Sequence, residues 1–137
     1  MQEKGLLKIL VICTGNSARS QMAEGFLKHY KKKWEIYSAG TKPKGLNPLA
    51  IEVMSEKETD ISGYKSKSID LFLNKKFDYV ITVCDNARES CPVFPGSAEY
   101  IHWSLKVPAA VKETREENLN AFRKTRDEIY NKVLEFI

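Results

Sequence analysis

A run of apolar residues that ends in a cysteine constrains this 137-residue chain more than any other feature. Residues 7–12 read LKILVI, Cys13 follows, and a short polar loop leads into a helical pattern that begins at Gln21. Such a run is typical of a buried strand in a parallel sheet. A strand that delivers a cysteine to a loop before a helix places the sulfur beside backbone N–H groups, which stabilise a thiolate. We therefore predict an activated cysteine at position 13 that faces an oxyanion site.

The length and composition indicate one globular domain that spans residues 1–137, and we expect it to be a monomer. No apolar run is long enough to cross a membrane, and no signal-peptide segment follows Met1, so we expect no membrane partner and a cytoplasmic location. The net charge of +4 is modest, and the short lysine clusters at 31–33 and 75–76 are not interleaved with aromatic residues. We therefore expect no nucleic-acid partner.

Strand patterns alternate with helix patterns along the chain. Besides the first strand, we predict strands at residues 34–38, 77–84 and 99–103, and helices at residues 21–30, 49–54, 69–73 and from 116 onward. This alternation favours an α/β, doubly wound three-layer domain with a four-stranded parallel sheet. Cys13 and Cys84 each end a predicted strand. Because ligands bind beyond the carboxyl ends of such strands, we expect both cysteines at that edge.

Cys13 and Arg19 have the Cys-x5-Arg spacing. A loop of this length can turn its N–H groups inward around a tetrahedral oxyanion, and the guanidinium can add a bidentate contact. Ser17 or Ser20 can hydrogen-bond the sulfur. We expect Cys13 to attack phosphorus or arsenic as a nucleophile. The predicted substrate-binding residues are Thr14, Gly15, Asn16, Ser17, Ala18, Arg19 and Ser20.

Three cysteines in a protein that we expect in the cytoplasm indicate reactivity rather than structural disulfides. Cys84 and Cys91 are seven residues apart, which is not the spacing of a zinc site, and we expect no metal and no cofactor. The alternative for Cys84 and Cys91 is a structural role as small buried apolar side chains.

The chain resembles the low-molecular-weight tyrosine phosphatase superfamily, and in particular its thioredoxin-coupled arsenate reductases. The segments that carry the resemblance are residues 11–25 (VICTGNSARSQMAEG), 37–40 (YSAG), 47–48 (NP), 60–62 (DIS), 84–92 (CDNARESCP) and 102–103 (HW). The resemblance covers nearly the whole chain and implies a low-molecular-weight phosphatase-like fold. Residues 84–92 and 102–103 point to the reductases rather than the phosphatases.

The resemblance implies an enzyme that reduces arsenate to arsenite in arsenic detoxification. In this scheme Cys13 attacks arsenate, Cys84 attacks Cys13 to give a Cys13–Cys84 disulfide, and Cys91 then forms a Cys84–Cys91 disulfide that thioredoxin reduces. A helix over residues 85–91 would hold the Cα atoms of Cys84 and Cys91 roughly 10 Å apart. A disulfide tolerates about 7 Å. We therefore expect this segment to open when the two cysteines pair.

The chain departs from the family pattern at two places. Val107 stands where the family has an aspartate that acts as general acid, and losing a general acid typically costs roughly 10²- to 10⁴-fold in rate. Glu113 and Asp85 are weak candidates to replace it. Asn16, Glu24 and Ser38 match the potassium ligands of some reductases, but Lys67 occupies the matching aspartate position. We expect the Lys67 ammonium to replace the cation, so that no potassium binds.

Two other functions stay open on the sequence. One is a tyrosine phosphatase that acts through a Cys13 phosphoenzyme, and the absent general acid at Val107 argues against it. The other is an anion-binding or redox-sensing module without turnover.

Overall fold

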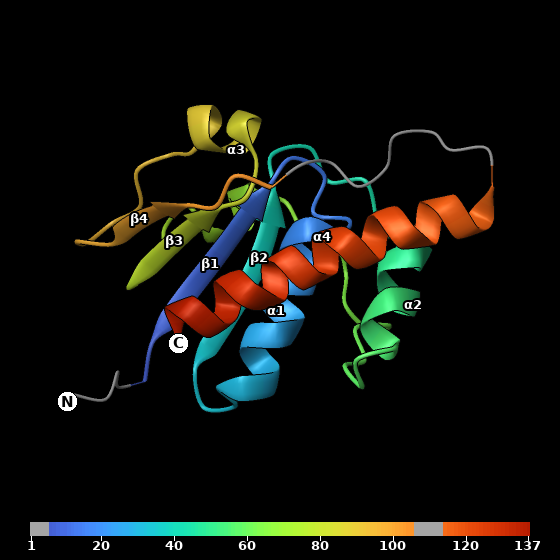
Figure 1. Ribbon diagram of the computed structural model, residues 1–137. Coiled ribbons are helices and arrows are strands. Elements are labelled where there is room, and N and C mark those ends of the chain that lie inside the picture. The colour runs from blue at the N-terminus through green and yellow to red at the C-terminus, as the bar shows by residue number, and fades with distance from the viewer. Residues whose placement is uncertain (1–5, 106–113) are drawn as a thin grey trace.

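The sheet has four parallel strands in the spatial order β2-β1-β3-β4 (Figure 1). The computed structural model describes residues 6–105 and 114–137, and only the backbone of Asp85 and Asn86. The strands are β1 (Lys8–Cys13), β2 (Glu35–Gly40), β3 (Tyr79–Thr82) and β4 (Glu99–His102). Ile12 of β1 lies beside Ala39 of β2 and Thr82 of β3, so the carboxyl ends of these strands meet at one edge.

The strand connections run outward from the centre of the sheet toward both of its edges. The helices are α1 (Arg19–Tyr30), α2 (Pro48–Ser55), the single-turn 3₁₀ helix η1 (Ile69–Phe72), α3 (Asp85–Ser90) and α4 (Arg115–Phe136). β1 leads through α1 to β2 at one edge, and β3 leads through α3 to β4 at the other. The predicted α/β, doubly wound fold with a four-stranded parallel sheet is confirmed. Among the described residues, no helix combines the length and apolarity that crossing a membrane requires.

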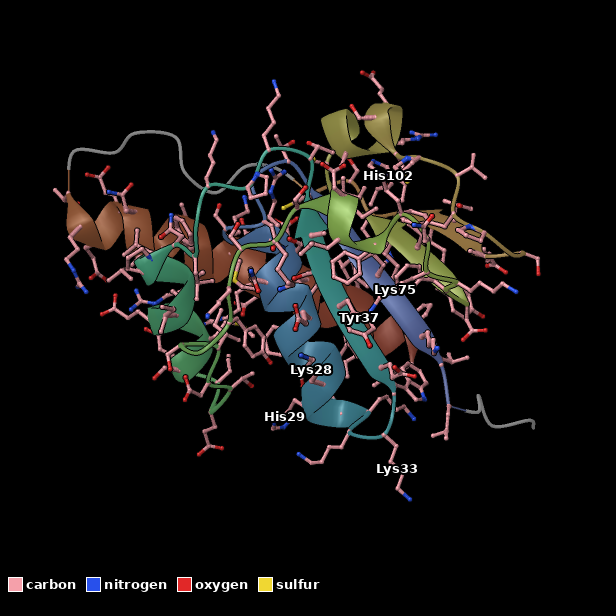
Figure 2. The ribbon with its side chains drawn as sticks, turned by 180° about the vertical axis from the view of Figure 1, so that it is seen from behind. Lys28, His29, Lys33, Tyr37, Lys75 and His102 are labelled. Carbon is pink, nitrogen blue, oxygen red and sulfur yellow. The ribbon has the colours of Figure 1, made fainter. Side chains whose placement is uncertain are left out.

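Aromatic side chains mark the two faces of the sheet. On one face, α4 packs against α1, and the Phe136 ring meets the rings of Trp34, Tyr79 and Trp103. On the other face, the Phe72 ring of η1 lies 5.4 Å from the Tyr37 ring, measured between centroids. Figure 2 shows this second face, where the Lys75 ammonium lies 5.1 Å from the centre of the Tyr37 ring.

Three of the helices start where the sequence places a capping side chain. Asn47 accepts from the Leu49 N–H before α2, Ser68 caps η1, and Thr114 accepts from the Glu117 N–H at the start of α4. α1 is different, because its N-cap is Ala18, which has no side-chain acceptor. The first N–H groups of α1 are therefore not capped by a side chain of their own helix.

Two boundaries differ from the predictions in ways that matter for the site. α1 begins at Arg19 rather than Gln21, which places Ser20 in its first turn. β3 covers only Tyr79–Thr82 instead of residues 77–84, because its ladder with β4 is four residues long. Cys84 therefore stands two residues beyond the strand, as the N-cap of α3.

Candidate active site

Residues 13–18, which we call the Cys13 loop, have every backbone carbonyl bound from outside. Residues 41–47, which follow β2, donate four backbone N–H groups to this loop. The bonds run from Thr41 to Cys13 (3.2 Å), Lys42 to Thr14 (2.8 Å), Lys44 to Gly15 (2.9 Å) and Asn47 to Ser17 (2.8 Å). The Asn16 carbonyl accepts from Gln21 Nε2 (3.1 Å) and the Ala18 carbonyl from the Met22 N–H (2.8 Å).

This arrangement determines where the N–H groups of the loop point. Because a peptide unit is planar and trans, a carbonyl held on the outside directs the following N–H away from it. Among the described residues, no hydrogen bond is donated by the backbone N–H groups of Thr14, Gly15, Ser17 or Ala18. Several unused donors in one tight loop before a helix form a nest that suits a tetrahedral anion.

The Cys13 sulfur receives two short hydrogen bonds inside this loop. The Asn16 N–H donates to Sγ at 3.1 Å, and Ser20 Oγ lies 2.9 Å from Sγ. Ser20 Oγ itself accepts from Asn16 Nδ2 at 2.7 Å, so its own hydrogen is left for the sulfur. Of the two serines that the sequence proposed, Ser20 makes this contact. Both donors favour the thiolate, because hydrogen bonds to a charged form stabilise it.

Asn16 connects this sulfur to a buried polar network. Its backbone has φ 46°, the left-handed region, where asparagine is among the tolerated residues. Its Oδ1 accepts from Gln21 Nε2 (3.1 Å) and the Lys67 N–H (2.8 Å), and its Nδ2 donates to Ser38 Oγ (2.9 Å) as well as to Ser20. The side chain is fully buried and uses all its hydrogen-bonding groups, which fixes the amide orientation.

The network ends at Glu24, a carboxylate that is only 3% exposed. Ser38 Oγ donates to Glu24 Oε1, the Lys28 ammonium lies 2.5 Å from Oε2, and the Lys67 ammonium lies 4.0 Å from Oε1. Burial lowers the pKa of the Lys67 ammonium, the Glu24 carboxylate opposes this, and Lys28 reinforces it. Asn16, Ser38 and Glu24 thus do come together beside Lys67. That no potassium binds here stays a prediction.

Arg19 is half-buried at the start of α1, and its Nη1 donates to the Leu105 carbonyl at 3.1 Å. Its other N–H groups make no hydrogen bond or ion pair within the described part of the chain. They are therefore available for an anion in the loop, where a guanidinium can bind two oxygens.

Cys84 lies beside the Cys13 loop, as expected from the ends of the strands. Thr14 Oγ1 is 3.2 Å from Cys84 Sγ, and the Ala87 N–H points at the same sulfur at 3.4 Å. Both contacts come from groups that can donate to a thiolate. Thr14, which the sequence marked only for substrate binding, is also the residue that connects Cys13 to the second cysteine.

Cys91 follows α3 and stands apart from this network. It is half-buried, and its thiol donates weakly to the Pro92 carbonyl at 3.5 Å. Burial raises the pKa of the Cys91 thiol, so this cysteine is held as the thiol in the reduced protein. The helix between Cys84 and Cys91 is formed, as the predicted 10 Å separation supposes.

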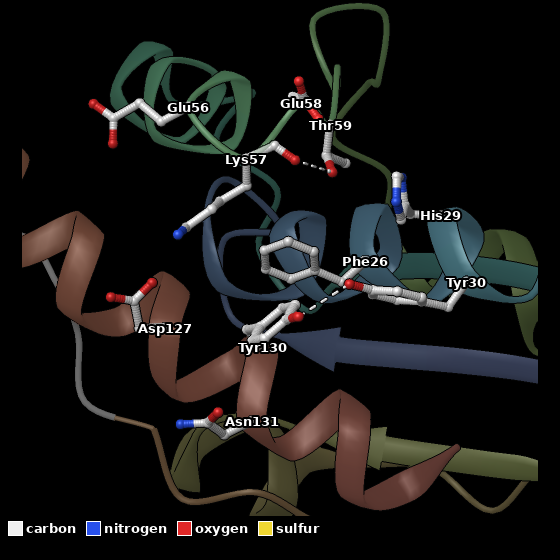
Figure 3. A pocket seen from close by; sticks show the side chains of 10 residues that line it. All are labelled: Phe26, His29, Tyr30, Glu56, Lys57, Glu58, Thr59, Asp127, Tyr130 and Asn131. Atoms are coloured by element: carbon white, nitrogen blue, oxygen red, sulfur yellow. Dashed lines mark hydrogen bonds between the residues drawn. The ribbon is translucent and has the colours of Figure 1, made fainter.

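A cavity of about 580 Å³ lies between α1, the end of α2 and α4 (Figure 3). Its lining includes Phe26, Tyr30 and Tyr130, and the Tyr30 hydroxyl donates to the Tyr130 hydroxyl at 3.1 Å. That hydrogen bond, together with burial, raises the pKa of Tyr30. None of the three cysteines lines this cavity, and we assign it no part in the site.

The sequence missed the residues that support the Cys13 loop from behind. Gln21 and Ser66 bind loop carbonyls through their side chains, and residues 41–47 do so through the backbone. Only the short polar loops before Asn47 and Ile69 could have suggested this role. Val107, Glu113 and the side chain of Asp85 lie outside the described residues. The absence of a general acid at position 107, and its replacement by Glu113 or Asp85, therefore stay predictions from the sequence.

Residues 8–137 match the family described as low molecular weight phosphotyrosine protein phosphatase. The chain belongs to this family. The arsenate reductase of Shouchella clausii (strain KSM-K16) is 44% identical to it over 129 residues, which cover 93% of both proteins.

Two solved structures resemble the chain in fold and in sequence. One, described as an arsenate reductase in the phosphate binding state, is 31% identical with a TM-score of 0.75, and the match covers 96% of both chains. The other is the thioredoxin-dependent arsenate reductase of Corynebacterium glutamicum, 29% identical with a TM-score of 0.64 over 96% of this chain and 64% of that one. The resemblance to the arsenate reductases of the family, predicted from the sequence segments, is confirmed.

Proposed function

We propose that this protein is an arsenate reductase in which Cys13, Cys84 and Cys91 pass two electrons to arsenate. The observation that carries the proposal is the contact between Thr14 and Cys84 at 3.2 Å, which brings a second thiol to a loop built for an oxyanion. A phosphatase needs no second thiol, because water hydrolyses its phosphoenzyme. Relatives named arsenate reductase support the same choice.

In the first step the Cys13 thiolate attacks the arsenic of the dihydrogen arsenate anion. The sulfur–arsenic bond forms, one arsenic–oxygen bond breaks, and the departing hydroxyl takes the proton of the second hydroxyl and leaves as water. The inward N–H groups of the Cys13 loop and the guanidinium of Arg19 stabilise the negative charge on the remaining oxygens. Ser20 Oγ and the Asn16 N–H direct hydrogen bonds at the sulfur and orient it for the attack. The product is a covalent Cys13–arsenic adduct.

In the second step the Cys84 thiolate attacks Cys13 Sγ. The Cys13–Cys84 bond forms, the sulfur–arsenic bond breaks, and its electron pair stays on arsenic, which becomes arsenite. The Thr14 hydroxyl and the Ala87 N–H are placed to stabilise the Cys84 thiolate before this attack.

In the third step Cys91 attacks Cys84 and releases Cys13 as a thiolate. The new Cys84–Cys91 disulfide requires α3 to open, since a helix holds the two cysteines too far apart. An external dithiol then reduces this disulfide, and we propose thioredoxin, which the name of the Corynebacterium glutamicum relative supports. The whole chain would act as one monomeric domain, residues 1–137, in the cytoplasm.

The test measures arsenate-dependent NADPH oxidation with thioredoxin and thioredoxin reductase, beside hydrolysis of para-nitrophenyl phosphate. We expect steady arsenate turnover by the reduced protein and weak phosphatase activity. Cys13→Ser should abolish both activities. Cys91→Ser should release about one arsenite per protein and then stop, because the Cys13–Cys84 disulfide cannot be resolved. Absence of an arsenate-dependent signal from fully reduced protein would overturn the proposal, and unchanged turnover by Cys91→Ser would overturn the relay.

A further inference from the structure

The peptide unit between Gly15 and Asn16 connects the outside of the Cys13 loop to the nucleophile. Its N–H end donates to Cys13 Sγ at 3.1 Å. Its carbonyl end accepts two hydrogen bonds, from the Lys44 N–H at 2.9 Å and from Ser66 Oγ at 3.0 Å. Because the unit is planar, any rotation that frees the carbonyl also turns the N–H away from the sulfur.

We propose that Ser66 is a positioning residue for Cys13, which acts by holding the Gly15 carbonyl outward so that the Asn16 N–H stays on the sulfur. Ser66 does not contact the sulfur or the anion site. The inference rests on the proposed role of Cys13 as nucleophile, and it adds a residue that neither the Cys-x5-Arg motif nor the strand ends reveal.

The Gly15 carbonyl is where a second anchor matters most. Counting bonds from the described residues, the other carbonyls of residues 13–18 have one each, whereas this one has two. Gly15 has no Cβ, so its own side chain does not restrict the peptide that follows it. The next residue, Asn16, holds a left-handed backbone with φ 46°. A freely rotating peptide at this point would lose that conformation and the bond to sulfur together.

The loop that carries Ser66 is itself firmly attached to the site. The Lys65 carbonyl accepts from Gln21 Nε2 at 3.0 Å, the Lys67 N–H donates to Asn16 Oδ1 at 2.8 Å, and the Lys67 carbonyl accepts from the Gly40 N–H at 2.8 Å. Ser66 stands between these two anchored residues and is half-buried. Its hydroxyl is therefore pre-positioned, and little further ordering is needed to make the bond.

Loss of the Ser66 hydroxyl should make the Cys13 thiolate less stable without removing any donor to the sulfur. Hydrogen bonds to the charged form of a group favour that form. A weakened N–H contact should therefore move the pH midpoint of Cys13 alkylation upward by about 0.5 to 1 unit. Complete loss of the hydrogen bond to the sulfur would give the largest shift. Below the midpoint the alkylation rate is proportional to the fraction of Cys13 present as thiolate. The same shift should therefore lower the rate at such a pH by about 3- to 10-fold.

The test uses a background of Cys84→Ser with Cys91→Ser, in which Cys13 is the one remaining thiol. Alkylation by iodoacetamide is followed against pH for this protein and for its Ser66→Ala, Ser66→Thr and Ser68→Ala derivatives. Ser68 is the matched control, because it lies in the same loop and its hydroxyl caps η1 instead of binding the Cys13 loop. Circular dichroism and thermal unfolding show that each derivative is folded.

We expect the midpoint to rise in Ser66→Ala, to return toward the parent value in Ser66→Thr, and to stay unchanged in Ser68→Ala. An unchanged midpoint in a folded Ser66→Ala protein, or equal shifts in the two alanine variants, would overturn the inference. If Ser66→Ala does not fold, Ser66→Cys is titrated instead, because a thiol is a much weaker hydrogen-bond donor than a hydroxyl. Mass spectrometry of the Cys13 peptide separates its alkylation from that of the new thiol, and a parent-like midpoint there counts against the proposal. The measurement needs no arsenate turnover, so it decides the role of Ser66 even if the proposed activity fails.

Discussion

The Cys13 loop and the segment of residues 84–91 both bring a cysteine to the carboxyl edge of the sheet, yet their backbones are held in opposite ways. The Cys13 loop has all its carbonyls bound by other parts of the chain. In residues 84–91 the two cysteines flank the short helix α3, and the described side-chain bonds of that segment are those of the cysteines. In the proposed relay, the first segment keeps its shape while an anion binds, and the second has to open.

The comparison shows that the two thiols are prepared for different moments of the proposed reaction. Cys13 receives its hydrogen bonds from a fixed frame and is ready before substrate arrives. Cys91 is kept as a thiol, since burial raises its pKa. In the proposed relay it becomes a nucleophile when the helix before it opens. If Cys13 is held ready in its loop while Cys91 waits behind a closed α3, Cys84 and Cys91 would not pair before Cys84 has attacked Cys13.

The most disruptive test of the comparison is a methyl group behind the Cys13 loop. A Cβ on Gly40 would stand 2.6 Å from the Thr14 carbonyl oxygen and 2.9 Å from the Asn16 nitrogen, both backbone atoms. Gly40→Ala should therefore displace the loop, lower kcat/KM for arsenate by about 100-fold or more, and lower the free energy of unfolding by about 1–3 kcal/mol. Steady-state kinetics and urea unfolding measure the two effects.

The matched change in the other segment is Glu89→Gly, on an exposed position of α3. It should weaken that helix by about 1 kcal/mol and keep kcat/KM within about threefold, because opening of the helix is part of the proposed relay. If Glu89→Gly lost as much activity as Gly40→Ala, the proposed distinction between an anchored Cys13 loop and an opening segment at residues 84–91 would be wrong.

The delayed reactivity of Cys91 can be measured directly. In a Cys13→Ser, Cys84→Ser protein, alkylation of Cys91 should need a higher pH than an exposed thiol, because burial raises the pKa of the Cys91 thiol. The proposed relay requires α3 to open in the Cys13–Cys84 disulfide form, so alkylation of Cys91 in that form at neutral pH should be about tenfold faster than in the reduced protein. Mass spectrometry of the alkylated peptide gives both rates. Equal rates in the two forms would mean that the helix does not gate this thiol.

The partly buried Lys67 ammonium and the buried Glu24 carboxylate lie in the polar network behind the Cys13 loop, and they predict a further difference between the two segments. Lys67→Gln leaves the Glu24 carboxylate with one close cation, Lys28, and should destabilise the protein by about 1–2 kcal/mol. It should also slow the attack by Cys13 more than the later exchange steps.

Exchange of potassium chloride for choline chloride at equal ionic strength should not change wild-type activity or melting temperature. A potassium-dependent rate would show that Lys67 does not replace a cation.

The smallest effect is expected far from both segments, at the ion pairs between α2 and α4. Arg123 and Arg126 hydrogen-bond Glu56 and hold its pKa at about 2, below its ordinary 4.5. A lowered pKa stabilises the fold above pH 4.5, and this contribution is lost as the pH falls from about 4.5 toward about 2. Since 35% of the Glu56 side chain is exposed, we expect Glu56→Gln to cost only about 1 kcal/mol at pH 7 and nothing near pH 2.

Activity per folded molecule should be the same in Glu56→Gln as in the wild-type protein. Acid titration of unfolding by urea, with arsenate kinetics at neutral pH, tests both parts of this expectation. A change in kcat would indicate that the Cys13 loop depends on overall stability more than on its own anchors.

The sequence was sufficient for the strands and for the position of Cys13, because a buried apolar run and the Cys-x5-Arg spacing are local patterns. It also placed Cys84 near Cys13, since parallel strands end at a common edge. It could not show that Ser66 and residues 41–47 hold the Cys13 loop, because these contacts join segments that are distant along the chain and mostly use backbone atoms. It placed the start of α1 two residues late, since Ala18 gives none of the usual N-cap signals.

Residues 41–47 support the anion site with N–H groups, which every residue except proline supplies. Pro43 is the one proline between Thr41 and Lys44, and it occupies the position from which no bond to the loop is donated. The backbone bonds from positions 42 and 44 therefore do not depend on which side chains stand there, as long as neither residue is proline. Part of the frame of the anion site is thus encoded by the path of the chain after β2 and not by particular side chains.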